Sequence, residues 1–143
     1  VEALVMEVKE ELKAAGVPFK EIRTGIMMET PAAVMIGEEL AKRVDFLGIG
    51  TNDLTQYTLA MDRQNPLLQK KYDDHHPAIL KMIKMIVDAG HAQNCKVCLC
   101  GELAADTRLT ETFLQMGVDA LSVGPACILP VRKALRAVCI AEM

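Results

Sequence analysis

Chemically reactive side chains follow three of the four apolar runs that the sequence marks as strands. Glu29 ends the first run, Asn52 and Asp53 follow the second, and Cys100 and Glu102 end the third. In parallel α/β folds the carboxyl ends of the strands carry the functional site. Because these side chains come from separate strands, their convergence indicates a site more strongly than any one of them does.

Glu29 and Asp53 are candidate ligands for a hard cation. Mg²⁺ is bound through one or two carboxylates, while substrate phosphate and water complete its octahedron. The same acidic residues would also stabilise helix N-termini through the helix dipole. Spacing alone does not separate these two interpretations.

Two further features could bind an anion. Residues 51–52 could present backbone N–H groups at a helix start, where Gly48 and Gly50 leave room for a ligand, although an ordinary tight turn also explains them. Arg63 carries a planar fork suited to phosphate or carboxylate, although a surface pair with Asp62 would also account for it.

The thiol of Cys100 could donate a proton or attack a carbon. Because side chains alternate between the two faces of a strand, Cys98 is expected on the same face of the strand as Cys100. The alternative role for a cysteine is that of a small buried apolar residue, which we favour for Cys98, Cys127 and Cys139.

Zinc or redox chemistry is not expected at the C-x-x-C spacing of Cys95 and Cys98. A zinc site would need a second ligand pair, and His75, His76 and His91 lack the spacing for one. We expect His75 and His76 to lie in a loop before the next helix.

The spacing of apolar residues alternates along the chain between a strand-like and a helix-like period, and it predicts the strands and helices that position these residues. Strands are expected at residues 22–28, 44–49, 97–100 and 120–123, and helices at 4–12, 32–42, 54–61, 77–93, 108–116 and 129–138. Residues 62–76 form a polar loop of a length that is usually functional. This order predicts one α/β domain with a parallel sheet and crossover helices.

Composition excludes several classes of function. The 143 residues carry 16 basic and 19 acidic side chains, a net charge of −3, with no Trp, 2 Tyr and 3 Phe, so we expect no nucleic-acid partner. The sequence contains no run of eighteen apolar residues, so we expect no membrane-spanning segment, and no signal peptide is visible. Five cysteines without a disulfide-scaffold pattern favour a reduced, cytoplasmic protein.

Three motifs resemble the C-terminal domain of phosphoenolpyruvate-utilising enzymes. They are GIMMETPAA at residues 25–33, GTNDLTQY at 50–57 and CGELA at 100–104. Within that family, Tyr57, AMDR at 60–63 and HPAIL at 76–80 are most similar to the enzyme I family of bacterial sugar phosphotransferase systems. Pyruvate phosphate dikinase and phosphoenolpyruvate synthase are the close relatives.

The resemblance implies a (β/α)₈ TIM barrel that binds phosphoenolpyruvate and Mg²⁺. By the motif matches, Glu29 and Asp53 would hold the metal, Asn52, Asp53 and Arg63 would bind phosphoenolpyruvate, and Cys100 would protonate the enolate carbon to give pyruvate. The implied reaction is Mg²⁺-dependent phosphoryl transfer from phosphoenolpyruvate to a protein histidine, the first step of sugar phosphotransfer. Ala105 and residues 47–48 depart from the usual pattern, but neither departure removes a ligand.

The length of the sequence shows how much of a barrel it can form. A full barrel takes about 250 residues, so residues 1–143 resemble the C-terminal half, four βα units, of a barrel from a larger enzyme. An N-terminal domain would carry the phospho-accepting histidine and contact the phosphocarrier protein, and the parent is expected to be a homodimer. We expect this part to be inactive alone and, because an incomplete barrel leaves open sheet, to self-associate or to rearrange its helices over the open side. A dikinase or synthase fragment and a non-catalytic binding or assembly module are the alternatives.

Overall fold

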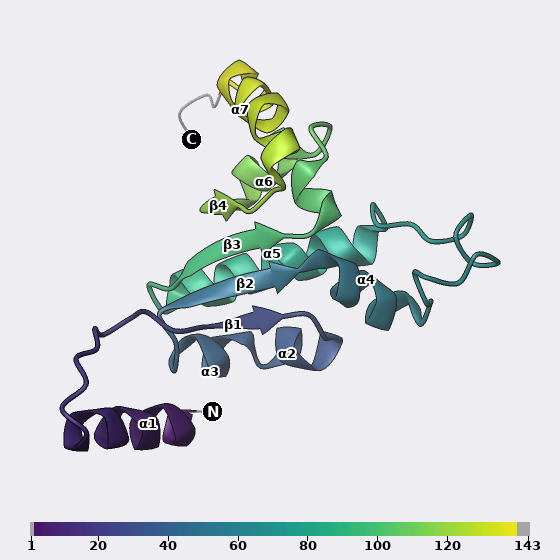
Figure 1. The fold of residues 1–143 in the computed structure, drawn as a ribbon. Coiled ribbons are helices and arrows are strands. Elements are labelled where there is room, and N and C mark those ends of the chain that lie inside the picture. Colours follow the sequence, from purple (N-terminus) through teal and green to yellow (C-terminus); the bar gives the residue numbers. More distant parts are fainter. Residues whose placement is uncertain (1, 140–143) are drawn as a thin grey trace.

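Four parallel strands form one sheet in the order β1-β2-β3-β4 in the computed structural model, which describes residues 2–139 (Figure 1). The strands are β1 (Gly25–Met28), β2 (Phe46–Gly50), β3 (Lys96–Cys100) and β4 (Ala120–Leu121). Their register aligns Met28 with Ile49, and Gly50 with Cys100, so the carboxyl ends of β1, β2 and β3 lie at one edge. The predicted α/β class and parallel sheet are confirmed.

Helices alternate with these strands, and two of them begin at a cap followed by proline. Thr30 Oγ1 accepts the N–H of Ala33 (3.2 Å), and His76 Nδ1 accepts the N–H of Ala78 (3.2 Å). Each cap satisfies an N–H that a helix start leaves free. The helices are α1 (Glu2–Ala14), α2 (Pro31–Met35), α3 (Gly37–Ala41), α4 (Thr51–Leu59), α5 (Pro77–Ala92), α6 (Thr110–Met116) and α7 (Ile128–Ala137), with short 3₁₀ helices η1 (Glu102–Ala105) and η2 (Pro125–Cys127).

One face of the sheet packs on α5, which runs behind β2 and β3 in Figure 1. Side chains from β2, β3 and α5 are fully buried there: Leu47, Ile49, Val97, Leu99, Ile79, Ile83, Ile86 and Val87. Gly90 makes the close approach possible, because a Cβ at that position would lie 2.6 Å from Val97 Cγ2. This layer fixes the strand ends that carry the candidate site.

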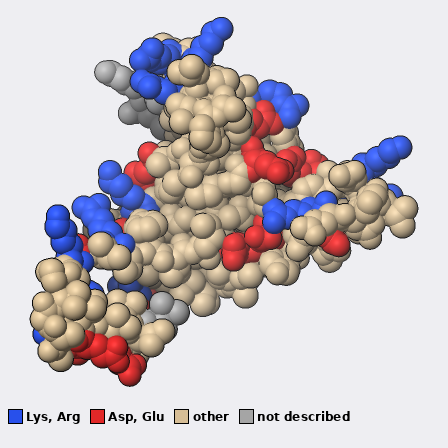
Figure 2. All heavy atoms as spheres, viewed as in Figure 1, with Lys and Arg blue, Asp and Glu red and all other residues tan. Residues whose placement is uncertain are grey.

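The other face of the sheet is open. Met27 and Phe46 are 48% and 39% exposed there, and their side chains lie over Gly48 and Gly25 of the neighbouring strands. Figure 2 shows a broad uncharged area at the centre of this view. Among residues 2–139 no helix is long and apolar enough to cross a membrane.

Several predicted boundaries were wrong. The helix expected at 32–42 is divided at Ile36, whose φ of −113° leaves the helical range before α3 begins. The strand expected from residue 22 starts at Gly25, because Thr24 donates its N–H to the carboxylate of Asp45 (2.7 Å). The last strand has two residues instead of four.

Of the two alternatives for residues 51–52, a helix start and an ordinary tight turn, the structure shows the helix start. Helix α4 begins at Thr51, three residues before the predicted position. Asn52 and Asp53 therefore occupy its first turn, where backbone N–H groups have no intrahelical partner.

Candidate functional site

At the carboxyl ends of β1, β2 and β3, two glycines allow polar side chains of neighbouring segments to approach the backbone closely. Glu29 lies over Gly50, where a Cβ would come within 2.9 Å of Glu29 Oε2. Gly101 has a φ of +95°, and a Cβ there would lie 2.4 Å from Thr51 Oγ1. Thr51 Oγ1 donates to the carbonyl of Cys100 (2.8 Å). Side chains at either glycine would disrupt this edge.

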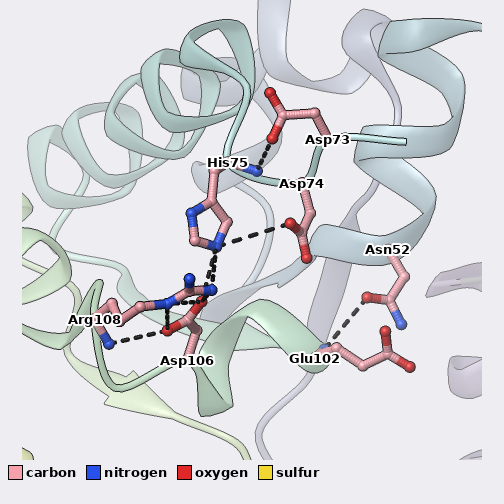
Figure 3. Close-up of polar contacts among 7 residues, drawn as sticks. All are labelled: Asn52, Asp73, Asp74, His75, Glu102, Asp106 and Arg108. Carbon is pink, nitrogen blue, oxygen red and sulfur yellow. Dashed lines mark hydrogen bonds and ion pairs between the residues drawn. The ribbon is translucent and has the colours of Figure 1, made fainter. Parts of the chain in front are cut away.

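Asn52 is held through both its side chain and its backbone. Its Oδ1 accepts the N–H of Glu102 (3.3 Å), as Figure 3 shows. Its backbone carbonyl accepts the hydroxyl of Tyr72 (3.0 Å). Its NH₂ group makes no hydrogen bond to the described residues and can therefore donate to a ligand.

Asp53 and Arg63 form an ion pair, with 3.4 Å between Arg63 Nη2 and Asp53 Oδ1. The alternative pair of Arg63 with Asp62 was wrong, since Asp62 Oδ1 instead accepts the N–H of Gln64 (2.9 Å). Both side chains of the Asp53–Arg63 pair are about one-third exposed, 38% and 35%, so solvent screens their attraction. The guanidinium therefore remains accessible to a ligand.

Arg63 also lines a cleft of about 500 Å³ beside the strand ends. Its walls are polar: Asn52, Arg63, Gln64, Gln69, Tyr72, Asp74 and Glu102. The structure thus brings the predicted residues Asn52 and Arg63 to one cavity from α4 and from the loop between α4 and α5. Tyr72, which the sequence did not single out, forms part of the same wall.

Cys100 is half-buried, with its Sγ 4.0 Å from that of Cys98. Burial, reinforced by Cys100, raises the pKa of Cys98 to about 11, so Cys98 stays protonated near neutral pH. The expectation that three cysteines are buried apolar residues was wrong, because Cys98 and Cys127 are half-buried and Cys139 is exposed. Cys98 and Cys100 do share one face, as predicted.

A cluster of charged side chains beside the site was not predicted. Asp106 Oδ2 accepts from Arg108 Nη2 (2.6 Å) and lies 2.8 Å from His75 Nε2, while Asp74 lies 3.8 Å from the same nitrogen (Figure 3). The hydrogen bonds from Arg108 hold the pKa of Asp106 well below its usual range. Through this cluster the end of the α4–α5 loop contacts the loop after η1.

The donor set at the strand ends fits a hard cation. Within the described part of the chain, the side chain of Glu29 forms no hydrogen bond or ion pair, and Asp53 has Arg63 as its ionic partner. Both offer carboxylate oxygens, which Mg²⁺ prefers. Among residues 2–139 no group of three or more His, Cys, Asp or Glu is placed to hold a metal ion, so a cation here would need water or substrate oxygens as well.

Comparisons with known proteins match nearly the whole chain. The model of the PEP-binding domain of PEP-utilising enzymes matches residues 1–140. Phosphoenolpyruvate-protein phosphotransferases are similar: that of Haemophilus influenzae is 43% identical over 137 residues (95% of this chain, 24% of the relative), and that of Streptococcus equinus is 41% identical over 142 residues (99% and 25%). That of Buchnera aphidicola subsp. Acyrthosiphon pisum is 44% identical over 133 residues (92% and 23%). The chain spans about a quarter of the length of these curated relatives.

Proposed function

The chain belongs to the PEP-utilising enzymes through their PEP-binding domain, and from that premise we propose that it binds phosphoenolpyruvate with Mg²⁺ at the carboxyl ends of β1, β2 and β3. The observation that carries the proposal is the convergence of Asn52, Arg63 and the Asp53 carboxylate beside one polar cleft. The parent reaction is phosphoryl transfer from phosphoenolpyruvate to a protein histidine. The relatives' names support that reaction over the dikinase and synthase alternatives.

In this proposal the acidic pair holds the metal and the basic residue holds the phosphate. Glu29 and Asp53 would be the protein ligands of Mg²⁺, which when bound neutralises charge on the transferring phosphoryl group. Arg63 would exchange its contact with Asp53 for a bidentate contact with phosphate oxygens. That exchange also frees Asp53 Oδ1 to bind the cation.

Asn52 and Cys100 would act on the rest of the substrate. The NH₂ group of Asn52, which has no partner within residues 2–139, lies on the cleft wall and would bind an anionic oxygen of the ligand. Cys100 would give its thiol proton to C3 of the enolate, which converts the enolate to pyruvate and leaves a thiolate for solvent to reprotonate. The carbonyl of Cys100 is fixed by Thr51, which holds this strand end in place.

We further propose that the sheet is the C-terminal half of a (β/α)₈ barrel. The parallel order of four strands and the helices on one face support this arrangement. The open face would then be the inner wall, and the remainder of a homodimeric parent would supply the other half of the site, the phospho-accepting histidine and the contact with the phosphocarrier protein. The chain alone would bind substrate without completing the transfer.

Isothermal titration calorimetry with phosphoenolpyruvate tests the proposal, with and without Mg²⁺. We expect saturable binding that needs Mg²⁺, and Arg63→Ala should weaken it about 10-fold or more, because a charge-assisted contact is lost. Arg43→Ala removes another exposed arginine outside this cleft and should leave the affinity unchanged. Absence of binding, or equal loss in both variants, would overturn the assignment.

A further inference from the structure

The loop between α4 and α5, residues 60–76, carries Arg63 and projects beyond the sheet edge in Figure 1. Two side chains fasten its second half to the elements that carry the site. Tyr72 donates its hydroxyl to the carbonyl of Asn52 in the first turn of α4, and His75 lies against Asp106 after η1. Arg63 lies in the first half of the loop, where its backbone N–H donates to Gln56 Oε1 on α4 (3.2 Å), so Tyr72 and His75 fix the second half of the loop, which faces Arg63 across the cleft.

Tyr72 joins the two walls of the cleft. It lines the cavity together with Asn52 and Arg63, and it comes from the same loop as Arg63 while bonding to the helix that carries Asn52. Burial raises the pKa of Tyr72, so the hydroxyl stays protonated and donates at neutral pH. The hydroxyl of Thr55, one turn further along α4, is fully buried and has no hydrogen-bond partner among the described residues.

Asn52 is consequently fixed from two sides. Glu102 holds its amide oxygen and Tyr72 holds its backbone carbonyl. These contacts leave the amide NH₂ as its free donor on the cleft wall. If the contact from Tyr72 is removed, we expect the orientation of this donor and the position of the opposite cleft wall to become less defined.

We propose that Tyr72 is a positioning residue of the phosphoenolpyruvate cleft, whose hydroxyl fastens the second half of the α4–α5 loop to α4 and so holds the wall of the cleft that faces Arg63 and fixes Asn52. The ligand part of this inference rests on the proposed function, whereas the fastening of the loop does not. Tyr72→Phe removes the hydroxyl and keeps the ring. The net loss of one neutral hydrogen bond corresponds to about fivefold in an equilibrium constant.

The second tyrosine of the chain provides a matched control, and tyrosine fluorescence provides an optical signal. It contains two tyrosines and no tryptophan, and Tyr57 lies on α4 with 57% of its surface exposed. Tyr57→Phe therefore removes a hydroxyl that makes no hydrogen bond within the described residues, and it leaves Tyr72 as the sole source of tyrosine fluorescence.

The first arm of the test needs no ligand. Hydrogen–deuterium exchange of a peptide covering residues 62–72 should be about fivefold faster in Tyr72→Phe than in Tyr57→Phe, because the loop opens more often. Equal exchange in the two variants would overturn the fastening of the loop, and with it the whole proposal.

The second arm uses phosphoenolpyruvate with Mg²⁺. Binding should alter the tyrosine emission of Tyr57→Phe but not that of Tyr72→Phe, and Kd measured by calorimetry should be about fivefold weaker in Tyr72→Phe alone. An unchanged Kd in Tyr72→Phe despite faster exchange would overturn the positioning role. If the wild-type chain binds no phosphoenolpyruvate, the proposed function fails and the role of Tyr72 toward that ligand is overturned with it, while the first arm still decides the fastening.

Discussion

Replacing Asp106 with Asn should destabilise the fold around the candidate site far more than a similar change at an ordinary surface carboxylate. The Asp106 side chain is 16% exposed and accepts the Nε, Nη2 and backbone N–H groups of Arg108 at 2.6–2.9 Å, with His75 Nε2 at 2.8 Å. Asparagine would lose the charge and turn an NH₂ donor toward one of these donors.

The expected magnitude follows from the hydrogen bonds that the substitution removes. Hydrogen bonds to charged groups contribute about 1.5–3 kcal/mol to the free energy of unfolding. Because the Arg108 side chain is 77% exposed, we place the contribution of its contact with Asp106 at the lower end of this range. We therefore expect the free energy of unfolding to fall by about 2 kcal/mol. With a urea m-value of about 2 kcal/mol/M, the midpoint would fall by about 1 M.

Urea unfolding followed by circular dichroism measures this change. Protein concentration must be fixed, since self-association shifts the midpoint. Asp88→Asn is the matched control, because Asp88 pairs with Lys84 across one turn of α5 and is 61% exposed. Such a pair contributes about 0.3–0.5 kcal/mol. Equal midpoint shifts in the two variants would show that the contacts of Asp106 stabilise the fold no more than an exposed ion pair does.

The difference in stability between the wild type and Asp106→Asn should also depend on pH. Because the pKa of Asp106 is lowered in the folded chain, its contribution to stability is complete above the unfolded-state pKa of about 3.9 and is lost as pH falls through the lower folded value. The difference between wild type and Asp106→Asn should therefore stay constant from pH 7 to about 5 and shrink below about 4. A difference that disappeared between pH 7 and 6 would contradict this assignment to the Asp106 carboxylate.

Three further outcomes are expected. Glu29→Gln should weaken Mg²⁺ binding at least about 10-fold in a phosphoenolpyruvate-saturated titration, because a charged ligand is lost; unchanged Mg²⁺ dependence would remove Glu29 from the site. In the complete enzyme, Cys100→Ala should slow pyruvate formation more than phosphate exchange between phosphoenolpyruvate and the enzyme, since proton donation follows transfer; pyruvate release at the parental rate would show that another group supplies the proton. Light scattering at micromolar concentration should detect self-association through the open face bearing Met27 and Phe46, and a monodisperse monomer with sharp cooperative unfolding would contradict it.

The strand ends could be predicted because their signals are local. Apolar runs of strand length, each followed by a polar or turn residue, place Glu29, Asn52 and Cys100 at one edge once the sheet is parallel. The cap at Thr30 followed by proline likewise predicts a helix start from neighbouring residues alone. Both inferences rest on periodicity and chain order, which the sequence carries directly.

The loop contacts could not be predicted, because no period constrains residues 62–76. Tyr72 reaches Asn52 across 20 positions and His75 reaches Asp106 across 31, so both contacts depend on the path of a loop without repeating pattern. The partner of Arg63 was missed for a related reason. Asp62 is adjacent in sequence, yet Asp53 in the first turn of α4 lies nearer to the guanidinium in space.

Mapping of amide chemical shifts by NMR tests the location of the phosphoenolpyruvate site most directly. On addition of phosphoenolpyruvate and Mg²⁺ to the labelled chain, shifts should concentrate at Glu29, Asn52, Arg63 and Glu102, at the carboxyl ends of β1, β2 and β3. His91, hydrogen-bonded to Asp119 before β4 at the opposite end of the sheet, should not shift. Shifts concentrated at that opposite end, or none at saturating ligand, would contradict the account.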